Sequence, residues 1–515
     1  MRDFIYRKLL IILVLFQPVI DIITSYMTMN GYKITVGIIT KVFIMALACF
    51  YLVFIDKEKR KFNIGFLFFL LLFASLNIYY NMAAIKLYAF TYFNYLFKYI
   101  YHLVILYFFI RWYKFYKINL YELRIPLIII VSTYLISLIT DTAYLSYDIY
   151  RKGYSGWYSS ANELGNILAL LFPVIIYNAF HNKDGIKFDT ALVVITSFCL
   201  LMIGTKVGLF GFYLTTLSYL ILRIIFIKRL KLDKAFGIIL VLVIVVTCFL
   251  PKLPTVYNIQ VKMREGNGNY LLSDRDKIFE KIMEQYKDAG IVQKIIGVPY
   301  YDTTGEINDI LIVEQDFFDI LFMYGIAGLL LILIIYAGIY VHFIKNYLYY
   351  RKRDKYSKKC LAVIFAISIE FTIAFISGHS LLSPSVSTFL CLIIAQSLSF
   401  DYQIYHKRKK SILIGTYGDL YKKINQDKYD VYVLGNVPNY KNINKYFDKE
   451  WFRFFKNKFM AYLLTRNQKF DYSLCNEKDE FIINYLYYAN AKEKYYLNNK
   501  NELFKEKNSI TNLNK

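Results

Sequence analysis

Hydrophobic residues in this 515-residue chain come in blocks of roughly 18 to 25, separated by short basic clusters. Blocks of that length match helices that cross the hydrocarbon core of a bilayer, about 30 Å thick. They fall at about 9–23, 34–55, 64–80, 92–110, 125–140, 162–180, 190–204, 207–226, 235–251, 317–344, 360–378 and 386–400. The pattern predicts an all-α polytopic membrane protein with about twelve transmembrane helices.

The basic clusters predict the orientation of these helices. Lys and Arg gather at 57–61, 111–117, 228–231 and 351–359, and cytoplasmic loops carry such an excess. An even number of helices then puts both termini in the cytoplasm. The first block carries Gln17, Pro18 and Asp21 and no small-residue cleavage site follows it, so it is expected to be a retained helix rather than a signal peptide.

Two polar regions interrupt the pattern. Residues 251–316 form a large outer loop between the ninth and tenth helices, and its stretch 274–288 has apolar residues at helical spacing, which predicts a folded cap on the membrane face. Residues 401–515 are expected in the cytoplasm, where strands at 411–415 and 429–435 flank a helix at 419–426, as in an α/β unit. The end of this segment, from 498 on, is expected to be disordered.

Composition supports the membrane assignment. The chain is 57% hydrophobic and only 19% charged, whereas an ordinary soluble enzyme is about a quarter charged. The net charge of +24 is explained by the cytoplasmic loops, so no nucleic-acid partner is expected. Five of the six cysteines lie in or beside apolar blocks and no CxxC spacing occurs, which argues against a disulfide framework and against a zinc site.

Polar side chains near the outer face are the candidate site residues, because a charged group facing lipid is costly. In the predicted topology this set comprises Arg151, Asn162, Glu163, Lys206, Arg275, Glu314, Asp316 and His379.

Each candidate also has an ordinary structural explanation. Asn162 and Glu163 fall in the first turn of a helix, where they could act as caps, although the nearby glycines and Trp157 could shape a re-entrant pocket. Lys206 could extend to the interface or hold phosphate as a point charge. Arg275 could belong to a solvated ion-pair cluster with its flanking aspartates or recognise a diphosphate.

Asp319 and His379 are weighed in the same way. Asp319 lies about one turn into the tenth helix, where burial would raise the pKa of an unpartnered carboxylate and suit it to general-base work. Of the five histidines, only His379 falls in a predicted outer loop, and either a structural or a catalytic role fits it.

In this order, the motifs resemble those of the O-antigen ligase and O-antigen polymerase family of bacterial membrane glycosyltransferases. The resemblance covers roughly residues 1–400. It rests on Arg151, Gly153, Asn162-Glu163-Leu164-Gly165, Thr205-Lys206-Val207-Gly208, Ser273-Asp274-Arg275, Gly297-Val298-Pro299, Glu314-Gln315-Asp316 and Gly325-Ile326-Ala327-Gly328. Gln17-Pro18, Asp21 and Gly378-His379 look like the Gram-positive branch. The chain departs from the family pattern at Glu314, where the ligases have a histidine, and at Lys206, where an arginine is usual.

The resemblance implies a GT-C-like enzyme of the bacterial cytoplasmic membrane that transfers glycan from undecaprenyl diphosphate on the outer face, with no metal and no cofactor. Arg275 and Lys206, with Arg151, would hold the donor diphosphate. Glu314 or His379 would accept the proton of the attacking hydroxyl. Asn162, Asp316 and Trp157 would position the glycans.

The resemblance also implies a glycan or a lipid-linked glycan as acceptor, and membrane lipid and other polysaccharide-assembly proteins as partners. Lys-, Ile-, Asn- and Tyr-rich usage is typical of an AT-rich genome, and Gram-positive cells have no lipopolysaccharide core, so polymerisation of a capsule-like polysaccharide is favoured over ligation. A flippase for lipid-linked sugars is the alternative, but no internal repeat of the transporter kind is evident.

Overall fold

A computed structural model describes most of the chain. It covers residues 4–113, 120–147, 150–181, 186–226, 234–264, 275–300, 309–350 and 354–406, with six strands between 410 and 505. The chain divides into two compact units, Met1–Ser399 and Phe400–Lys515.

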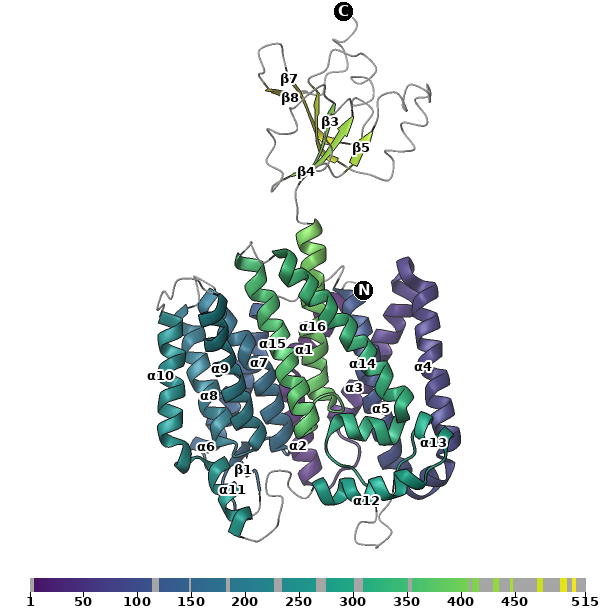
Figure 1. Cartoon of the computed structure of the whole chain (residues 1–515), viewed down its shortest axis with the longest axis vertical. Coiled ribbons are helices and arrows are strands. Elements are labelled where there is room, and N and C mark those ends of the chain that lie inside the picture. Colours follow the sequence, from purple (N-terminus) through teal and green to yellow (C-terminus); the bar gives the residue numbers. More distant parts are fainter. Residues whose placement is uncertain are drawn as a thin grey trace, which may run out of the picture. The chain divides into compact units, whose positions relative to one another are not determined.

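The first unit is a bundle of helices (Figure 1). Its first eight α-helices are α1 (Leu10–Leu15), α2 (Gln17–Met29), α3 (Val36–Phe50), α4 (Arg60–Tyr80), α5 (Met82–Trp112), α6 (Arg124–Ile139), α7 (Ala161–His181) and α8 (Ile186–Met202). The others are α9 (Lys206–Phe226), α10 (Lys234–Phe249), α11 (Pro254–Arg264), α12 (Arg275–Asp288), α13 (Ile291–Ile296), α14 (Asp316–Tyr350), α15 (Asp354–Ile376) and the first part of α16 (Pro384–His406). Short π-helical turns η1 (Phe4–Leu9) and η2 (Tyr51–Ile55), and 3-10 turns η3 (Lys57–Lys59), η4 (Leu120–Leu123) and η5 (Leu250–Lys252), adjoin them.

A helix lies over every apolar block predicted from the sequence. Seven helices in the described ranges are long and apolar enough to cross a membrane, and four shorter ones, such as Phe188–Met202 and Pro384–Leu398, are apolar too. Length and composition alone carry that conclusion. The chain is therefore a multi-pass membrane protein, while the number of crossings, the placement of the loops and the orientation of the termini stay predictions.

The helices α11 and α12 and the hairpin of β1 (Tyr144–Leu145) with β2 (Tyr154–Gly156) gather at one end of the bundle (Figure 1). The predicted cap is folded there: the buried Ile282 of α12 packs with Phe322 of α14, and Ile278 and Phe279 cover this cluster. Residues 265–274 and 301–308 of this loop lie outside the described residues.

A break in α14 lets the cap approach the bundle. Gly325 has φ +68°, and a Cβ there would lie 2.2 Å from the carbonyl oxygen of Ile295. From α4, the Asn77 amide donates to the carbonyls of Ile296 and Met323, at 2.9 and 3.0 Å. Only glycine fits this close backbone contact, which fixes the cap against α14 and α4.

The second unit contains a six-stranded sheet of order β5-β4-β3-β6-β7-β8. The strands are β3 (Lys410–Gly415), β4 (Tyr429–Leu434), β5 (Lys445–Phe447), β6 (Phe470–Cys475), β7 (Ala491–Leu497) and β8 (Leu503–Lys505). All neighbouring pairs are parallel except β7 with β8. The two predicted strands are confirmed, whereas the predicted helix at 419–426 lies outside the described residues. The prediction of disorder from 498 on is wrong at β8, because its backbone pairs with β7; the other residues from 498 on lie outside the described residues.

Candidate active site

A cavity of about 230 Å³ opens at the end of the bundle where the cap lies. Among the residues that the structure describes, four cationic side chains line it: Arg151 of the β1–β2 loop, Lys206 at the start of α9, Lys262 near the end of α11 and Arg275 at the start of α12. Glu314 is the one acidic residue among these described wall residues. Asn162 lines it from the first turn of α7. The structure therefore brings five of the predicted residues around one cavity and adds Lys262, which sequence reasoning missed.

Backbone contacts between glycines hold the cationic segments together. A Cβ at Gly204 would lie 2.5 Å from the carbonyl oxygen of Lys152, and both Gly204 and Gly153 have positive φ. Asn258 of α11 joins the same segments, because its Nδ2 donates to the carbonyls of Lys152 and Gly204 at 2.6 and 3.1 Å. Arg151 and Lys206 thus sit on rigidly paired turns, which favours precise positioning of an anion.

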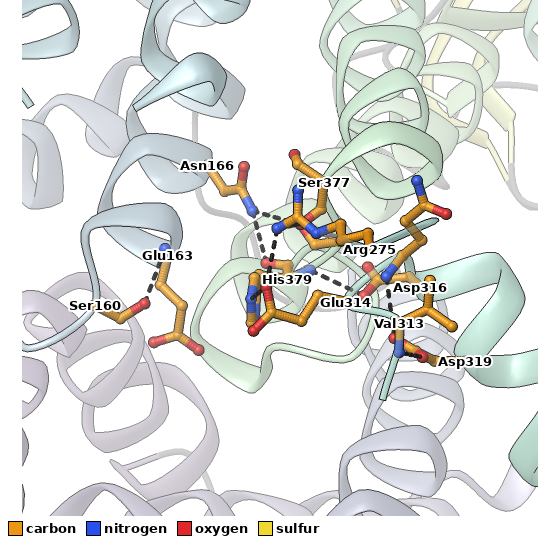
Figure 2. Close-up of polar contacts among 12 residues, drawn as sticks. Ser160, Glu163, Asn166, Arg275, Val313, Glu314, Asp316, Asp319, Ser377 and His379 are labelled. Atoms are coloured by element: carbon orange, nitrogen blue, oxygen red, sulfur yellow. Dashed lines mark hydrogen bonds and ion pairs between the residues drawn. The ribbon is translucent and has the colours of Figure 1, made fainter. Parts of the chain in front are cut away.

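Three side chains form a row beside the cavity (Figure 2). Nη2 of Arg275 donates to Oε2 of Glu314 at 2.9 Å and to the Ser377 carbonyl at 3.3 Å. The same Glu314 oxygen lies 3.8 Å from Nε2 of His379, a separation of an ion pair rather than a hydrogen bond. Arg275 is almost fully buried, whereas the Glu314 and His379 side chains are 49% and 32% exposed. Glu314 thus links an arginine to the histidine.

The row sets the protonation of its members. The His379 imidazole, together with Arg275, lowers the pKa of Glu314 to about 2, against the opposing effect of partial burial. Burial by itself would lower the pKa of His379, but the Glu314 carboxylate and the charges of Glu163 and Asp316 raise it above its ordinary value. A carboxylate with so low a pKa is a weak base, so Glu314 is better suited to stabilise an imidazolium than to accept a proton itself.

Asp316 holds the backbone on which His379 is carried. Its carboxylate accepts the backbone N–H groups of His379, Ser380 and Leu381 at 2.9, 2.8 and 2.6 Å, and its side chain is buried. Asp316 is not among the residues that line the cavity. A direct contact with a glycan was expected of it, but its hydrogen bonds support a role in positioning His379.

Asn166 of α7 holds the same loop from the other side. Its Nδ2 donates to the carbonyls of Gly378 and His379, at 3.0 and 2.9 Å (Figure 2). His379 itself has φ +61°, a left-handed conformation that must be held by such contacts. A Cβ at Gly378 would lie 2.5 Å from the Glu314 carbonyl oxygen, so glycine is required where this loop meets Glu314.

The sequence places Asp319 about one turn into the tenth helix, where a carboxylate is costly without a partner, and the structure provides two partners. Its carboxylate accepts the backbone N–H groups of Val313 and Gln315 at 2.8 and 3.1 Å. Glu314 stands between these two residues and has φ +59°. Asp319 therefore shapes the turn that presents Glu314.

Two further candidates lie away from the row. Nε1 of Trp157 donates to Oγ1 of Thr142 at 2.9 Å, and Trp157 is not among the residues that line the cavity. The N-terminal cap of α7 is Ser160, whose Oγ accepts the Glu163 N–H at 3.3 Å. The Glu163 carboxylate accepts from Ser383 at 2.8 Å, so capping does not account for Glu163.

The sequence model of the O-antigen ligase-like membrane proteins matches residues 3–269 and 257–399. The chain belongs to this family. The match spans the first unit, including every residue of the cavity and of the row, and it confirms the resemblance stated above. Membership indicates a membrane glycosyltransferase-type role. No curated protein matches the chain.

The O-antigen ligase-like site contains cations and hydrogen-bonding groups. Within the described residues, no three His, Cys, Asp or Glu side chains are grouped as metal ligands. The described groups that the cavity and the row offer for chemistry are the side chains of Arg151, Lys206, Lys262, Arg275, Glu314 and His379.

Proposed function

We propose that this O-antigen ligase-like protein polymerises surface polysaccharide on the outer face of the bacterial cytoplasmic membrane, from oligosaccharide units linked to undecaprenyl diphosphate. With the twelve-helix topology predicted from the basic clusters, both termini would lie in the cytoplasm. One observation carries the proposal: a cavity lined by four cations ends at an arginine that is paired, through Glu314, with a histidine. Cations suit a diphosphate leaving group, and a histidine suits proton transfer from a hydroxyl.

The donor's diphosphate would lie against Arg275, Lys206, Lys262 and Arg151. Nε of Arg275 is buried and makes no hydrogen bond within the described part of the chain, so a donor group remains to be satisfied there. As the glycosidic bond breaks, negative charge grows on the phosphate oxygen. Fixed cations in a partly enclosed site stabilise that charge without reorganising, which lowers the barrier.

The acceptor hydroxyl would meet His379. Its oxygen forms a bond to the anomeric carbon, the bond from that carbon to the phosphate oxygen breaks, and undecaprenyl diphosphate leaves with the electron pair. The hydroxyl proton passes to Nε2 of His379, which is neutral when it acts as the base. Glu314, 3.8 Å away, stabilises the imidazolium that forms.

We favour polymerisation over ligation because of the amino-acid composition and the motifs of the chain. Its Lys-, Ile-, Asn- and Tyr-rich usage and its Gram-positive-like motifs fit a cell without a lipopolysaccharide core. A polymerase needs two lipid-linked glycans, one as donor and one as acceptor.

Cells that lack the chain provide the test. Long surface polymer is expected to disappear while single lipid-linked repeat units accumulate on the outer face, and the intact chain is expected to restore polymer. Polymer that persists without attachment to its acceptor would show ligation instead. Accumulation on the inner face would show that the flippase alternative is right and that the enzyme proposal is wrong.

The pH dependence tests the role given to Glu314. Because only neutral His379 accepts a proton, the rate should rise with pH through the raised pKa of His379. Glu314→Gln removes the charge that raises this pKa, so the acid limb should move to lower pH while the maximal rate falls. Transfer rates of the purified protein between about pH 5 and pH 9 would show this shift. An acid limb that does not move would contradict the pairing.

A further inference from the structure

A second group of polar side chains lies inside the bundle, near His379 but outside the cavity. We call it the Asp21 cluster; it consists of Gln17, Asp21, Lys41, Glu163, Ser383 and Ser385. Oδ1 of Asp21 accepts from Gln17 at 2.6 Å and from Ser385 at 3.0 Å. Nζ of Lys41 lies 3.9 Å from the same oxygen. The cluster thus joins α2 and α3 to the start of α16.

Several of its atoms have bonding capacity that the described chain does not use. Oε1 of Gln17, Oδ2 of Asp21 and Nζ of Lys41 are buried and make no hydrogen bond there. Gln17 is fully buried and Lys41 is 4% exposed. Charged and polar groups at membrane depth are costly unless they serve a purpose, and buried groups normally find partners. A group that paired with both Oδ2 of Asp21 and Nζ of Lys41 would need a donor for the first and an acceptor for the second.

The cluster reaches the loop that carries His379. Ser383, in that loop, donates to Glu163 of α7 at 2.8 Å, and Ser385 follows at the start of α16. Neither His379 nor Glu163 lines the cationic cavity, although Asn162, next to Glu163, does. In the view of Figure 2, Glu163 and Arg275 lie on different sides of His379. His379 is therefore linked to both groups: to Arg275 of the cavity through Glu314, and to the cluster through Ser383 of its own loop.

Three members of the cluster are partly exposed. The Asp21 side chain is 14% exposed, and Glu163 and Ser385 are partly exposed as well. Lys41 and Gln17 form its buried side. A ligand that enters at the exposed edge would meet Asp21 and Glu163 first and Lys41 behind them.

We propose that the Asp21 cluster binds the sugar hydroxyls of the acceptor glycan, so that donor and acceptor reach His379 from two sides. This rests on the proposed function. The cluster contains the carboxyl groups of Asp21 and Glu163, whereas the cavity is lined by four cations, so a diphosphate is expected to prefer the cavity. A sugar hydroxyl both donates and accepts hydrogen bonds. Two neighbouring hydroxyls would satisfy Oδ2 of Asp21 and Nζ of Lys41 together.

Binding to the purified full-length protein tests this with two probes. One is undecaprenyl diphosphate, and the other is the repeat-unit oligosaccharide released by mild acid from the host's lipid-linked pool. The double variant Asp21→Asn/Lys41→Gln should bind the oligosaccharide roughly tenfold more weakly, since hydrogen bonds to two charged groups are lost. Its affinity for undecaprenyl diphosphate should stay within about twofold of the wild-type value.

Controls separate the proposal from misfolding and from the proposed function. Ser385→Ala, a milder change, should weaken only oligosaccharide binding. Asp189→Asn, at a buried carboxylate of α8 outside both sites, should change neither affinity. If the wild-type protein fails to bind the oligosaccharide, or if Arg275→Ala weakens its binding and the cluster variants do not, the acceptor proposal is wrong. Wild-type protein that does not bind undecaprenyl diphosphate would contradict the proposed function itself.

Discussion

Replacement of Arg275 by alanine is expected to slow glycosyl transfer by roughly 10²- to 10³-fold, the usual cost of losing one preorganised charge-stabilising group. Arg275 is almost fully buried at the cavity wall, where its charge is poorly screened by water. The substitution would also free Glu314 from its 2.9 Å ion pair. Single-turnover transfer from a lipid-linked donor measures the change without interference from product release.

Two matched variants check the Arg275 result. Arg275→Lys retains the charge but cannot reach both Glu314 and the Ser377 carbonyl as the guanidinium does, so it should restore only part of the rate. Lys277→Ala, at an exposed position on α12, should leave the rate unchanged. Equal rates for Arg275→Ala and the wild-type protein, at equal protein levels, would remove Arg275 from the site.

Replacement of His379 by asparagine is expected to reduce the rate by roughly 10²- to 10⁴-fold, the range associated with loss of a general base. Asparagine is chosen because it tolerates positive φ, and position 379 has φ +61°. The contacts of Asp316 and Asn166 to this loop involve backbone groups, so the variant keeps them. The loss should therefore appear in the chemical step, with undecaprenyl diphosphate still bound.

A histidine elsewhere provides the control for His379. His102 is buried in α5 and contacts Tyr336 of α14 at 2.9 Å, so His102→Asn should alter stability more than the rate of the folded protein. His379→Asn with a normal rate would show that another group accepts the proton.

Much of the bundle was predictable because apolar blocks and helical periodicity are local properties of the sequence. The helix α12 and the strands β3 and β4 lie within a residue of the predicted ranges. The break at Gly325 was not predictable, because it follows from the close approach of Ile295 to α14. Such contacts depend on tertiary packing and leave no periodic pattern.

The cations of the site were predictable for a similar reason. Lys206 lies between two apolar blocks, where charge is costly without a purpose, and Arg151 and Arg275 lie in predicted outer loops, on the face where the other candidates gather. Lys262 was missed because it lies in the polar region 251–316, which contains several other lysines. Asn166 could have been noticed as a polar residue in an apolar helix, four residues after Asn162.

The roles of the acidic residues needed the structure. Asp316 and Asp319 accept backbone N–H groups, and sequence does not reveal which N–H groups point at a carboxylate. The pairing of Glu314 with both Arg275 and His379 joins three distant segments. The sequence left both Glu314 and His379 as candidates for the general base. The low pKa of Glu314 in the structure favours His379 as the group that accepts the proton.

The most direct test of the central claim uses the purified full-length protein in proteoliposomes supplied only with lipid-linked oligosaccharide. The account predicts that the wild-type protein lengthens the lipid-linked chains and releases undecaprenyl diphosphate in step, and that Arg275→Ala and His379→Asn do neither at a comparable rate. Movement of intact lipid-linked oligosaccharide across the bilayer, with no chain growth and no release of undecaprenyl diphosphate, would contradict it.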